Sequence, residues 1–591
     1  LKDRAFRDLD FTELEHDYNY TNIVLSETGD LALTNPLPVG SFAGAAGATI
    51  TNVVRYPFVD WNHNYSVTSG GMTKLLTLES SFRPFISIKY IIDRIFEASE
   101  FTYSSTFFDT TEFEKLYMDF NWGADNAPVV FDSSGELTNA TDVGLGTTYI
   151  TIPFDEMDSP FVGGNPLDAN FGYSLGVFTA LEDGQVYTFN YDMQFNRSIL
   201  ADTLFVQWLV NGIPVDVATS TATFFTYSGS FTTPPLSAGD TVLCQAYSTL
   251  GLYELDGVLD ILGTTPSLVT ITTTSDQTTN DTLLGTLRGE LGQWDFLKGL
   301  ITMFNLITLV DEDNPNNIII EPYSDVFIPT TTGGTTLANR GIEHDWTDKI
   351  DVSEMKLTPL TDLNRKTIFK FVEDDDDYSF NQYKNLIGGH LYGSKKFNAG
   401  NEFNILDGLD EVIAEPFAAT VVKPLMSQFP EFITPAIYAR GGDGVWEGFE
   451  NSPRIMYNNG VETLSSTTYS VPAQNGVAGD AFVDKFLQFS HYKFGGTSLS
   501  AYRDFHFGEC QLLTNQVSTP NNLFNLYWLP YYNELYNPNT RIMTIKVNLN
   551  PSDINLFKFN DTVFIKNRTF RVNKINYKPN DLATVEFILI P

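Results

Sequence analysis

The chain has 591 residues, of which 73 are acidic and 35 basic, and its formal net charge at pH 7 is −38. A surface this acidic repels phosphate backbones and anionic lipid headgroups, which argues against nucleic-acid binding and charge-driven membrane association. Self-repulsion that keeps the protein soluble explains such a charge without any partner, and an acidic passage through which DNA slides is the alternative.

Charged residues make up only 18 % of the chain and aromatic residues 14 %, a mixture that is typical of β-rich folds with large aromatic contact surfaces. The length corresponds to about four domains. No apolar run reaches the roughly 18 residues of a membrane span. The two cysteines, Cys244 and Cys510, are far apart and form no CxxC pattern. We therefore expect two buried thiols, with neither a disulfide nor a zinc site.

The first predicted domain, residues 1–125, mixes strands with helices. Residues 53–61 alternate as a strand does. A helix is predicted to start at Arg83-Pro84, because proline is favoured in a first helical turn. Its apolar face consists of Phe85, Ile88, Ile92, Ile95 and Phe96. A second, shorter helix is predicted for residues 112–118.

The second predicted domain, residues 126–282, is an antiparallel β-sandwich inserted into the rest of the chain. Its clearest strands cover residues 185–194, 203–211, 222–227 and 241–247. Turn signals separate them, among them Asn211-Gly212. The combination of VNG with LSAGDTV resembles the jelly rolls of C1q/TNF-like domains and carbohydrate-binding modules. Trp208 and Tyr227 are candidates for stacking on glycans, although packing in the sandwich core is favoured for Trp208.

The third predicted domain, residues 283–375, has an α+β pattern. Trp294, Leu297, Ile301 and Phe304 recur at helical spacing. Strands are predicted at 306–310 and 318–320, with a polar turn at 311–317 between them. Asp311, Asp313 and Asn317 resemble a calcium loop, but Asn316 stands where that loop needs glycine, so a hairpin turn is favoured.

A loop is predicted at residues 330–340. The acidic run at 373–377 is expected to be a solvated loop, with cation binding at an assembly interface as the alternative. Residues 376–510 are predicted to form a loop-rich β domain. Residues 511–591 are predicted to form a closing β domain, and its four strands cover 541–549, 562–566, 569–575 and 584–590.

The sequence nominates no catalytic, cofactor or metal site. The histidines show neither HxH nor HExxH spacing, so each is expected to lie on the surface or in a satisfied interior position; they are His16, His63, His344, His390, His491 and His506. Among 73 acidic residues no carboxylate pair stands out as a glycosidase dyad. The chain is therefore predicted not to be an enzyme.

Several segments together resemble the tail hub or baseplate hub proteins of tailed bacteriophages, especially those that infect Bacteroidetes. They are YPFVDW at 56–61, the segment FRPFISIKYIIDRIFEASEFTYSSTFFDTTEFEKLYM at 82–118, the unit at 292–327 with DWTDKID at 345–351, and RIMTIKVNLNPSDINLFKFNDTVFIKNRTFRVNKI at 541–575. The inserted sandwich departs from the simplest hub pattern.

The resemblance implies an α+β, predominantly β scaffold of β-barrel-like domains that carries a jelly-roll-like insertion. It also implies a homotrimeric ring in the virion that joins the tail tube to the central spike or tip and lets the genome pass, with no cofactor. The closing strands and the two helices would form the trimer-facing core, with Phe85, Ile88, Ile92, Ile95, Trp294, Leu297, Ile301 and Phe304 as candidates. The alternative is a receptor-binding tail protein that recognises host glycan through the sandwich. A polysaccharide depolymerase is a third hypothesis.

Overall fold

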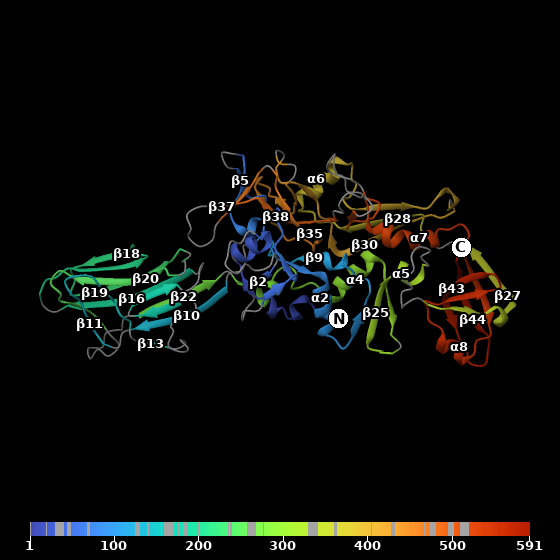
Figure 1. The fold of residues 1–591 in the computed structure, drawn as a ribbon, viewed down its shortest axis with the longest axis horizontal. Coiled ribbons are helices and arrows are strands. Elements are labelled where there is room, and N and C mark those ends of the chain that lie inside the picture. Colours follow the sequence, from blue (N-terminus) through green and yellow to red (C-terminus); the bar gives the residue numbers. More distant parts are fainter. Residues whose placement is uncertain are drawn as a thin grey trace.

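The computed structural model describes residues 2–18, 20–29, 41–43, 49–67, 71–124, 130–138, 141–154, 156–158, 171–174, 176–180, 186–197, 200–234, 236, 239–256, 268–275, 277–311, 313–328, 341–359, 363–403, 405–426, 429, 432–465, 467–472, 480–493, 502–508 and 519–590. The molecule is elongated (Figure 1), with a sandwich at one end, a central body, and a C-terminal sheet at the other end. The predicted class is confirmed: the protein is α+β and predominantly β. The expectation of β-barrel-like domains is wrong, because none of the sheets in the described ranges closes into a barrel.

The sandwich consists of two antiparallel sheets that enclose their own apolar core. The first sheet contains β10 (Val130–Thr138), β11 (Val143–Gly144), β13 (Glu156–Asp158), β16 (Val186–Arg197), β19 (Phe224–Thr232), β21 (Tyr253–Leu255) and β22 (Leu268–Ser275). The second contains β12 (Ile150–Thr151), β14 (Phe171–Ser174), β15 (Val177–Ala180), β17 (Leu204–Val210), β18 (Ile213–Ser220) and β20 (Thr241–Ser248). Because β10 pairs antiparallel with β22, the chain enters and leaves the sandwich along neighbouring strands.

Asn211 and Gly212 form the predicted turn between β17 and β18. Both have positive φ angles, 50° and 76°, as a two-residue hairpin turn of type I′ requires. Cys244 on β20 is buried, as predicted. Cys510 and the predicted loop at 330–340 lie outside the described residues.

The central body combines several small sheets. The largest has the strand order β38 (Lys485–Ser490), β35 (Ile455–Thr463), β9 (Leu116–Asp119), β7 (Phe85–Ser87) and β4 (Val54–Arg55). The other sheets of three or four strands are β37 (Asp480–Val483), β36 (Tyr469–Pro472), β6 (Thr73–Leu75) and β5 (Tyr65–Val67); β24 (Leu306–Val310), β25 (Asn317–Pro322) and β8 (Thr102–Ser104); and β29 (Lys395–Asn398), β28 (Lys366–Val372) and β30 (Leu409–Ala418).

Two-stranded ribbons complete the β structure of the central body: β1 (His16–Asp17) with β23 (Gln277–Thr278), β2 (Ser41–Ala43) with β3 (Thr49–Thr51), β31 (Val422–Pro424) with β32 (Ile433–Pro435), β33 (Ala439–Arg440) with β34 (Trp446–Glu447), and β39 (Tyr492–Lys493) with β40 (Arg503–Asp504). Its α-helices are α1 (Ser26–Thr28), α2 (Ile88–Glu97), α3 (Asn280–Leu284), α4 (Gln293–Phe304), α5 (Tyr323–Phe327), α6 (Tyr378–Leu386) and α7 (Leu529–Leu535). The π-helix Phe524–Trp528 leads into α7.

Two helix predictions near the N-terminus need correction. The predicted helix at 83–96 begins only at Ile88, and Phe85 lies in strand β7. The helix predicted at 112–118 is wrong, because a short 3₁₀ turn is followed there by β9, whose four residues are all buried. Buried central strands are apolar throughout and lose the alternation that distinguishes a strand from a helix. Residues 53–61 contribute the short strand β4 and two isolated bridges, at Phe58 and Asp60.

The helix–strand–turn–strand unit at 292–327 is confirmed as α4, β24 and β25. Asn305 ends α4 in the left-handed conformation, with φ 48°. In the turn, the Asn317 amide donates to Asp311 Oδ2 at 2.8 Å, as the hairpin interpretation predicts. Helix α4 packs closely against β30 at Gly299. A Cβ atom at this position would lie only 2.5 Å from the Glu415 carbonyl oxygen.

The C-terminal sheet has the strand order β26 (Glu343–Asp345), β42 (Thr562–Ile565), β43 (Arg568–Asn576), β44 (Ala583–Leu589), β41 (Arg541–Val547) and β27 (Ile350–Pro359). The short helix α8 (Pro551–Leu556) lies within this unit. Residues 343–359 therefore share a sheet with residues 541–589, which the predicted division at 375 and 511 separates. The reason is that β26 and β27 form its two edges and Trp346 between them joins its core. A boundary of this kind, set by pairing between distant segments, has no local signal in the sequence.

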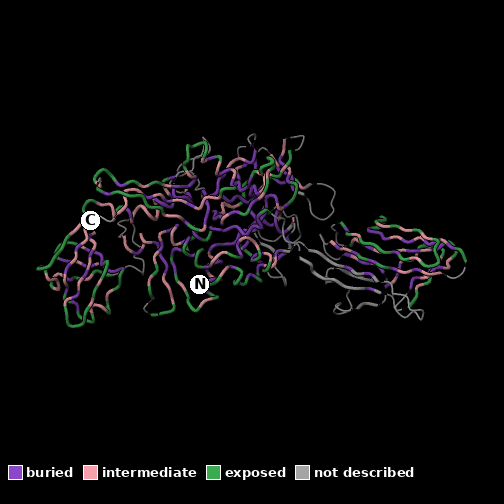
Figure 2. The backbone as a smooth tube through the Cα atoms, turned by 180° about the vertical axis from the view of Figure 1, so that it is seen from behind, coloured by how far each residue is buried: buried purple, intermediate pink, exposed green. Residues whose placement is uncertain are grey.

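Buried segments concentrate in the central body (Figure 2), where one large apolar cluster joins segments from residue 6 to residue 532. The sandwich and the C-terminal sheet each have a separate core. Among the described residues, no helix combines the length and the apolar character that crossing a lipid bilayer requires.

Candidate functional site

The helical residues predicted to face other subunits lie mostly inside the chain's own core. Ile88, Ile92 and Ile95 on α2 are fully buried there, as is Phe85 in a neighbouring cluster. On α4 the buried face is centred on Phe296, Leu300 and Met303.

The stripe predicted on α4 is thus rotated away from the face that packs. Leu297 and Phe304 are buried, Ile301 is half-buried, and Trp294 remains 37 % exposed. Of the candidates on the two helices, only Trp294 offers a large accessible surface to a partner. An assembly role for the closing strands stays a prediction.

The predicted glycan-stacking residues are in the sandwich core. Trp208 is fully buried, and Tyr227 is 4 % exposed. The Trp208 ring packs 5.5 Å from that of Tyr191, and Tyr191 lies 4.8 Å from Tyr227. A ring with no open face cannot stack on a sugar, so the stacking role is wrong for both residues. The alternation of side chains along β17 explains why Trp208 is buried, because Trp208 shares the inward face with Leu204 and Val206.

Two buried arginines hold the central body together through carboxylates from distant segments. The Asp119 carboxylate on β9 accepts hydrogen bonds from Arg288 Nη2 at 2.6 Å and from the Asn451 amide at 3.1 Å. Arg454 is 1 % exposed and donates to Asp374 and, at 3.1 Å, to Asp377. A buried ion pair of this kind is costly to break, because removal of one partner leaves an unpaired charge in the interior.

The prediction of a solvated loop at 373–377 is therefore wrong for two of its carboxylates. Asp377 is fully buried and caps α6 by accepting from the Phe380 N–H at 2.9 Å. Burial raises its pKa, while the guanidinium of Arg454 opposes the rise. The sequence does not show that Asp377 has a buried cationic partner, because Arg454 lies almost eighty residues further along the chain.

A cluster of His491, Asp504 and His506 is the best candidate for a metal site among the described residues. Antiparallel pairing of β39 with β40 brings the first two together. Asp504 Oδ1 lies 2.9 Å from His491 Nδ1 and 3.6 Å from His506 Nδ1. All three are buried. Two imidazoles and a carboxylate would suit Zn²⁺. In the sequence, only the close spacing of Asp504 and His506 points to this cluster.

Hydrogen bonding on the far side of the rings fits a structural network better than a metal ion. The Thr420 N–H donates to His506 Nε2 at 3.4 Å, so that ring carries its proton on Nδ1, toward Asp504. A metal bound to His506 Nδ1 would leave the ring proton on Nε2, where it would face the Thr420 N–H, which is also a donor. His491 Nε2 lies 2.8 Å from the Tyr392 hydroxyl. Both imidazoles are therefore satisfied without an ion.

The protonation states agree with a neutral network. Burial lowers the pKa of His491 to about 3 and that of His506 well below its ordinary value. Burial also raises the pKa of Asp504 to about 7. The expectation of satisfied interior histidines is confirmed here and at His16, whose ring contacts the Leu14 carbonyl and the Tyr56 hydroxyl.

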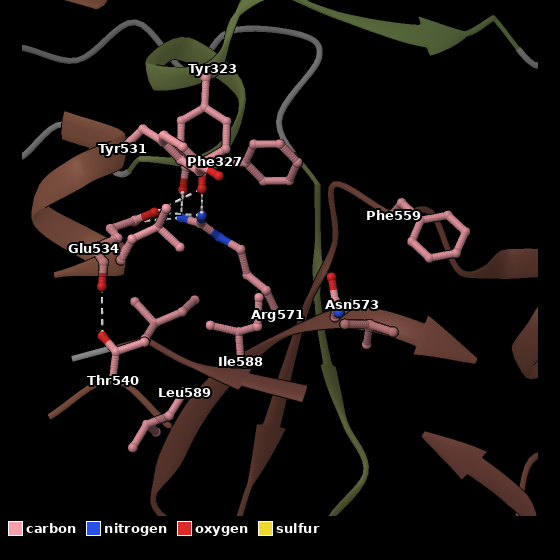
Figure 3. Close-up of a pocket in the computed structure, with 13 residues that line it drawn as sticks. Tyr323, Phe327, Tyr531, Glu534, Thr540, Phe559, Arg571, Asn573, Ile588 and Leu589 are labelled. Carbon is pink, nitrogen blue, oxygen red and sulfur yellow. Dashed lines mark hydrogen bonds and ion pairs between the residues drawn. The ribbon is translucent and has the colours of Figure 1, made fainter. Parts of the chain in front are cut away.

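A cavity of about 220 Å³ lies where the C-terminal sheet meets the central body (Figure 3). Arg571 on β43 reaches into it and binds Glu534 on α7 through both guanidinium ends, at 2.6 Å each. The Tyr323 hydroxyl donates to the same carboxylate at 2.8 Å, and the guanidinium lies 4.8 Å from the centre of the Phe327 ring. Because the Glu534 carboxylate pairs with the Arg571 guanidinium, the cavity offers no free charge to a ligand. Its residues clamp the sheet to the body.

Comparisons with known proteins assign the chain to no family, so its class is given by its architecture, which is α+β and predominantly β. No protein-family model and no curated protein matches the chain. Crystal structures of murine APRIL at pH 8.5, 8.0 and 5.0 align with 24 % of this chain and 97 % of APRIL, at 8 % identity and TM-scores of 0.17, 0.18 and 0.17. Similarity this low carries no conclusion about fold or function.

Proposed function

We propose that this chain is a structural subunit of a phage tail or baseplate hub, which joins the tail tube to the central spike or tip and forms part of the genome-ejection channel. One observation carries the proposal. The segments that resemble hub proteins, at 82–118, 292–327 and 541–575, build the central body and the C-terminal sheet. Strands β10 to β22 of the departing segment instead form the sandwich at the far end (Figure 1).

The mechanism is mechanical and requires no catalytic residue. Buried ion pairs such as Arg454 with Asp377 join distant segments of the central body. Subunits would close into a homotrimeric ring through repeated heterologous contacts. The net charge of −38 favours passage of DNA over its retention, because acidic walls do not hold phosphates. The working location of such a subunit is the virion, after assembly in the cytoplasm of the bacterial host.

Co-assembly tests the proposal. The purified full chain should form a discrete ring by native mass spectrometry and negative-stain microscopy, and should form a complex with the tail-tube protein encoded in the same genome. Neighbouring genes should encode tape-measure and baseplate proteins. A chain that stays monomeric at high concentration and forms no complex with the tube protein would contradict the proposal.

A further inference from the structure

The outer face of the second sandwich sheet carries an aromatic row and an amide row side by side. Pairing of β12, β20, β17 and β18 places Tyr247 opposite Phe205, and Phe205 opposite Thr219. Tyr149 precedes β12 and lies 4.5 Å from the Tyr247 ring. The rings of Tyr247 and Phe205 are stacked at 4.8 Å. This row crosses the sheet on its solvent side, because alternate residues on the same strands fill the core.

The amide row lies two residues further along each strand. Thr151 is opposite Gln245, Gln245 is opposite Gln207, and Gln207 is opposite Val217. Among the described residues, neither glutamine amide has a hydrogen-bond partner. Each can both donate and accept. Two neighbouring amides on an open face thus keep their full hydrogen-bonding capacity.

No side chain in either row carries a charge, in a protein whose net charge is −38. The next outward positions on β20, Leu243 and Thr241, are uncharged as well. The face is open, since Tyr149 is 44 % exposed and Val217 63 % exposed. An uncharged face gives no attraction to a cationic partner and offers no counter-charge to an anionic one. Its partner is therefore expected to be neutral.

We propose that this face is a binding site for a neutral saccharide with pyranose rings. The apolar C–H face of such a ring packs on the exposed Tyr149 ring at the end of the row, because Tyr247 and Phe205 stack on each other. The sugar hydroxyls exchange hydrogen bonds with the amides. The rows span about 14 Å across four strands, which accommodates a short oligosaccharide. A dry protein interface fits less well, because it would bury the Gln207 and Gln245 amides at a cost unless the partner met each of them. The proposal is independent of the hub role.

The test is binding of the full chain to an array of neutral gluco-, manno-, galacto- and xylo-oligosaccharides together with uronate- and sialate-containing ones. Neutral members should bind selectively. For the best of them, calorimetry should give a dissociation constant about tenfold higher in Tyr149→Ala and in Gln245→Ala. The control is Phe224→Ala, which removes a ring that is 71 % exposed on β19 of the other sheet and should leave binding unchanged.

Three results would overturn the site. They are no binding to any array member, equal loss in Phe224→Ala, and a fall in oligomeric mass on Tyr149→Ala, which would make the face a protein contact. Unchanged melting temperatures of the variants show that the fold is retained. A monomeric chain that still binds saccharide would contradict the hub role alone, so the two proposals fail separately.

Discussion

Arg454 is the residue at which a single substitution should cost the most. Its side chain is buried between Asp374 and Asp377, so Arg454→Met leaves two carboxylates without their cation. Loss of one partner of a buried pair costs about 3–5 kcal/mol in free energy of unfolding. Calorimetry should show a large fall in the melting temperature of the central body.

Arg7→Met is the matched control for this substitution. Arg7 pairs with Glu290 on the surface, where the side chains are 60 % and 76 % exposed. Such a pair contributes about 0–1 kcal/mol, because water screens both charges. Equal effects of the two substitutions would mean that Arg454 does not hold the central body together.

The triad of His491, Asp504 and His506 predicts a specific pH dependence. A histidine whose folded pKa lies below its unfolded value near 6.5 makes the unfolded chain bind more protons, so stability rises with pH up to about 6.5. Asp504 acts in the opposite direction between about pH 4 and 7, because its folded pKa is raised to about 7. Two histidines outweigh one aspartate, so the triad makes the folded chain more stable as the pH rises through this range.

Unfolding of His491→Gln at pH 4.5, 5.5 and 6.5 measures this effect. The variant should be less stable than the native chain at pH 6.5, and the difference should shrink as the pH falls, because only the native chain keeps an extra imidazole neutral. His390→Gln, at an exposed histidine, should follow the native curve at every pH. A difference that does not change with pH would mean that His491 is not held neutral.

At the scale of elements, the sequence predicts what alternation and periodicity encode locally. The sandwich strands, the unit at 292–327 and the four closing strands are found close to their predicted positions. The errors fall where a strand is buried on both faces, as at β7 and β9, since such strands have no polar side. The glycan-stacking role of Trp208 fails for a related reason, because the sequence predicts the alternation of a strand but not which set of side chains faces the core.

The contact between the C-terminal sheet and the central body can be tested at the pair of Arg571 on β43 and Glu534 on α7. Glu534→Gln keeps the shape of the side chain but leaves Arg571, which is 7 % exposed, without a counter-charge. We expect a loss of about 2–3 kcal/mol, between the values for exposed and buried pairs. Hydrogen exchange should speed up in β43 and α7 and stay unchanged in β17.

Glu354→Gln provides the control within the same sheet. It removes the exposed pair of Glu354 with Lys546, which joins β27 to β41 on the surface. Exchange in β43 should not respond to this change. If Glu534→Gln accelerated exchange throughout the chain, or nowhere, Arg571 would not be a local clamp.

At the scale of the whole molecule, self-association must overcome like-charge repulsion. Each subunit brings a net charge of −38, so a ring of several copies concentrates negative charge that only counter-ions can offset. The Debye length falls from about 30 Å at 0.01 M salt to about 8 Å at 0.15 M, a distance shorter than a subunit. Apolar contacts between subunits are not weakened by this change.

The proposed ring should therefore form more readily as the salt concentration rises. Mass photometry of the full chain at 0.01, 0.15 and 0.5 M NaCl should show the oligomer growing at the expense of the monomer, with most of the change below about 0.15 M. Magnesium chloride at equal ionic strength should act at least as strongly, because divalent ions neutralise carboxylates more effectively. Dissociation at high salt would be the opposite outcome, and it would mean that charge pairs across the interface, and not apolar surfaces, hold the subunits together.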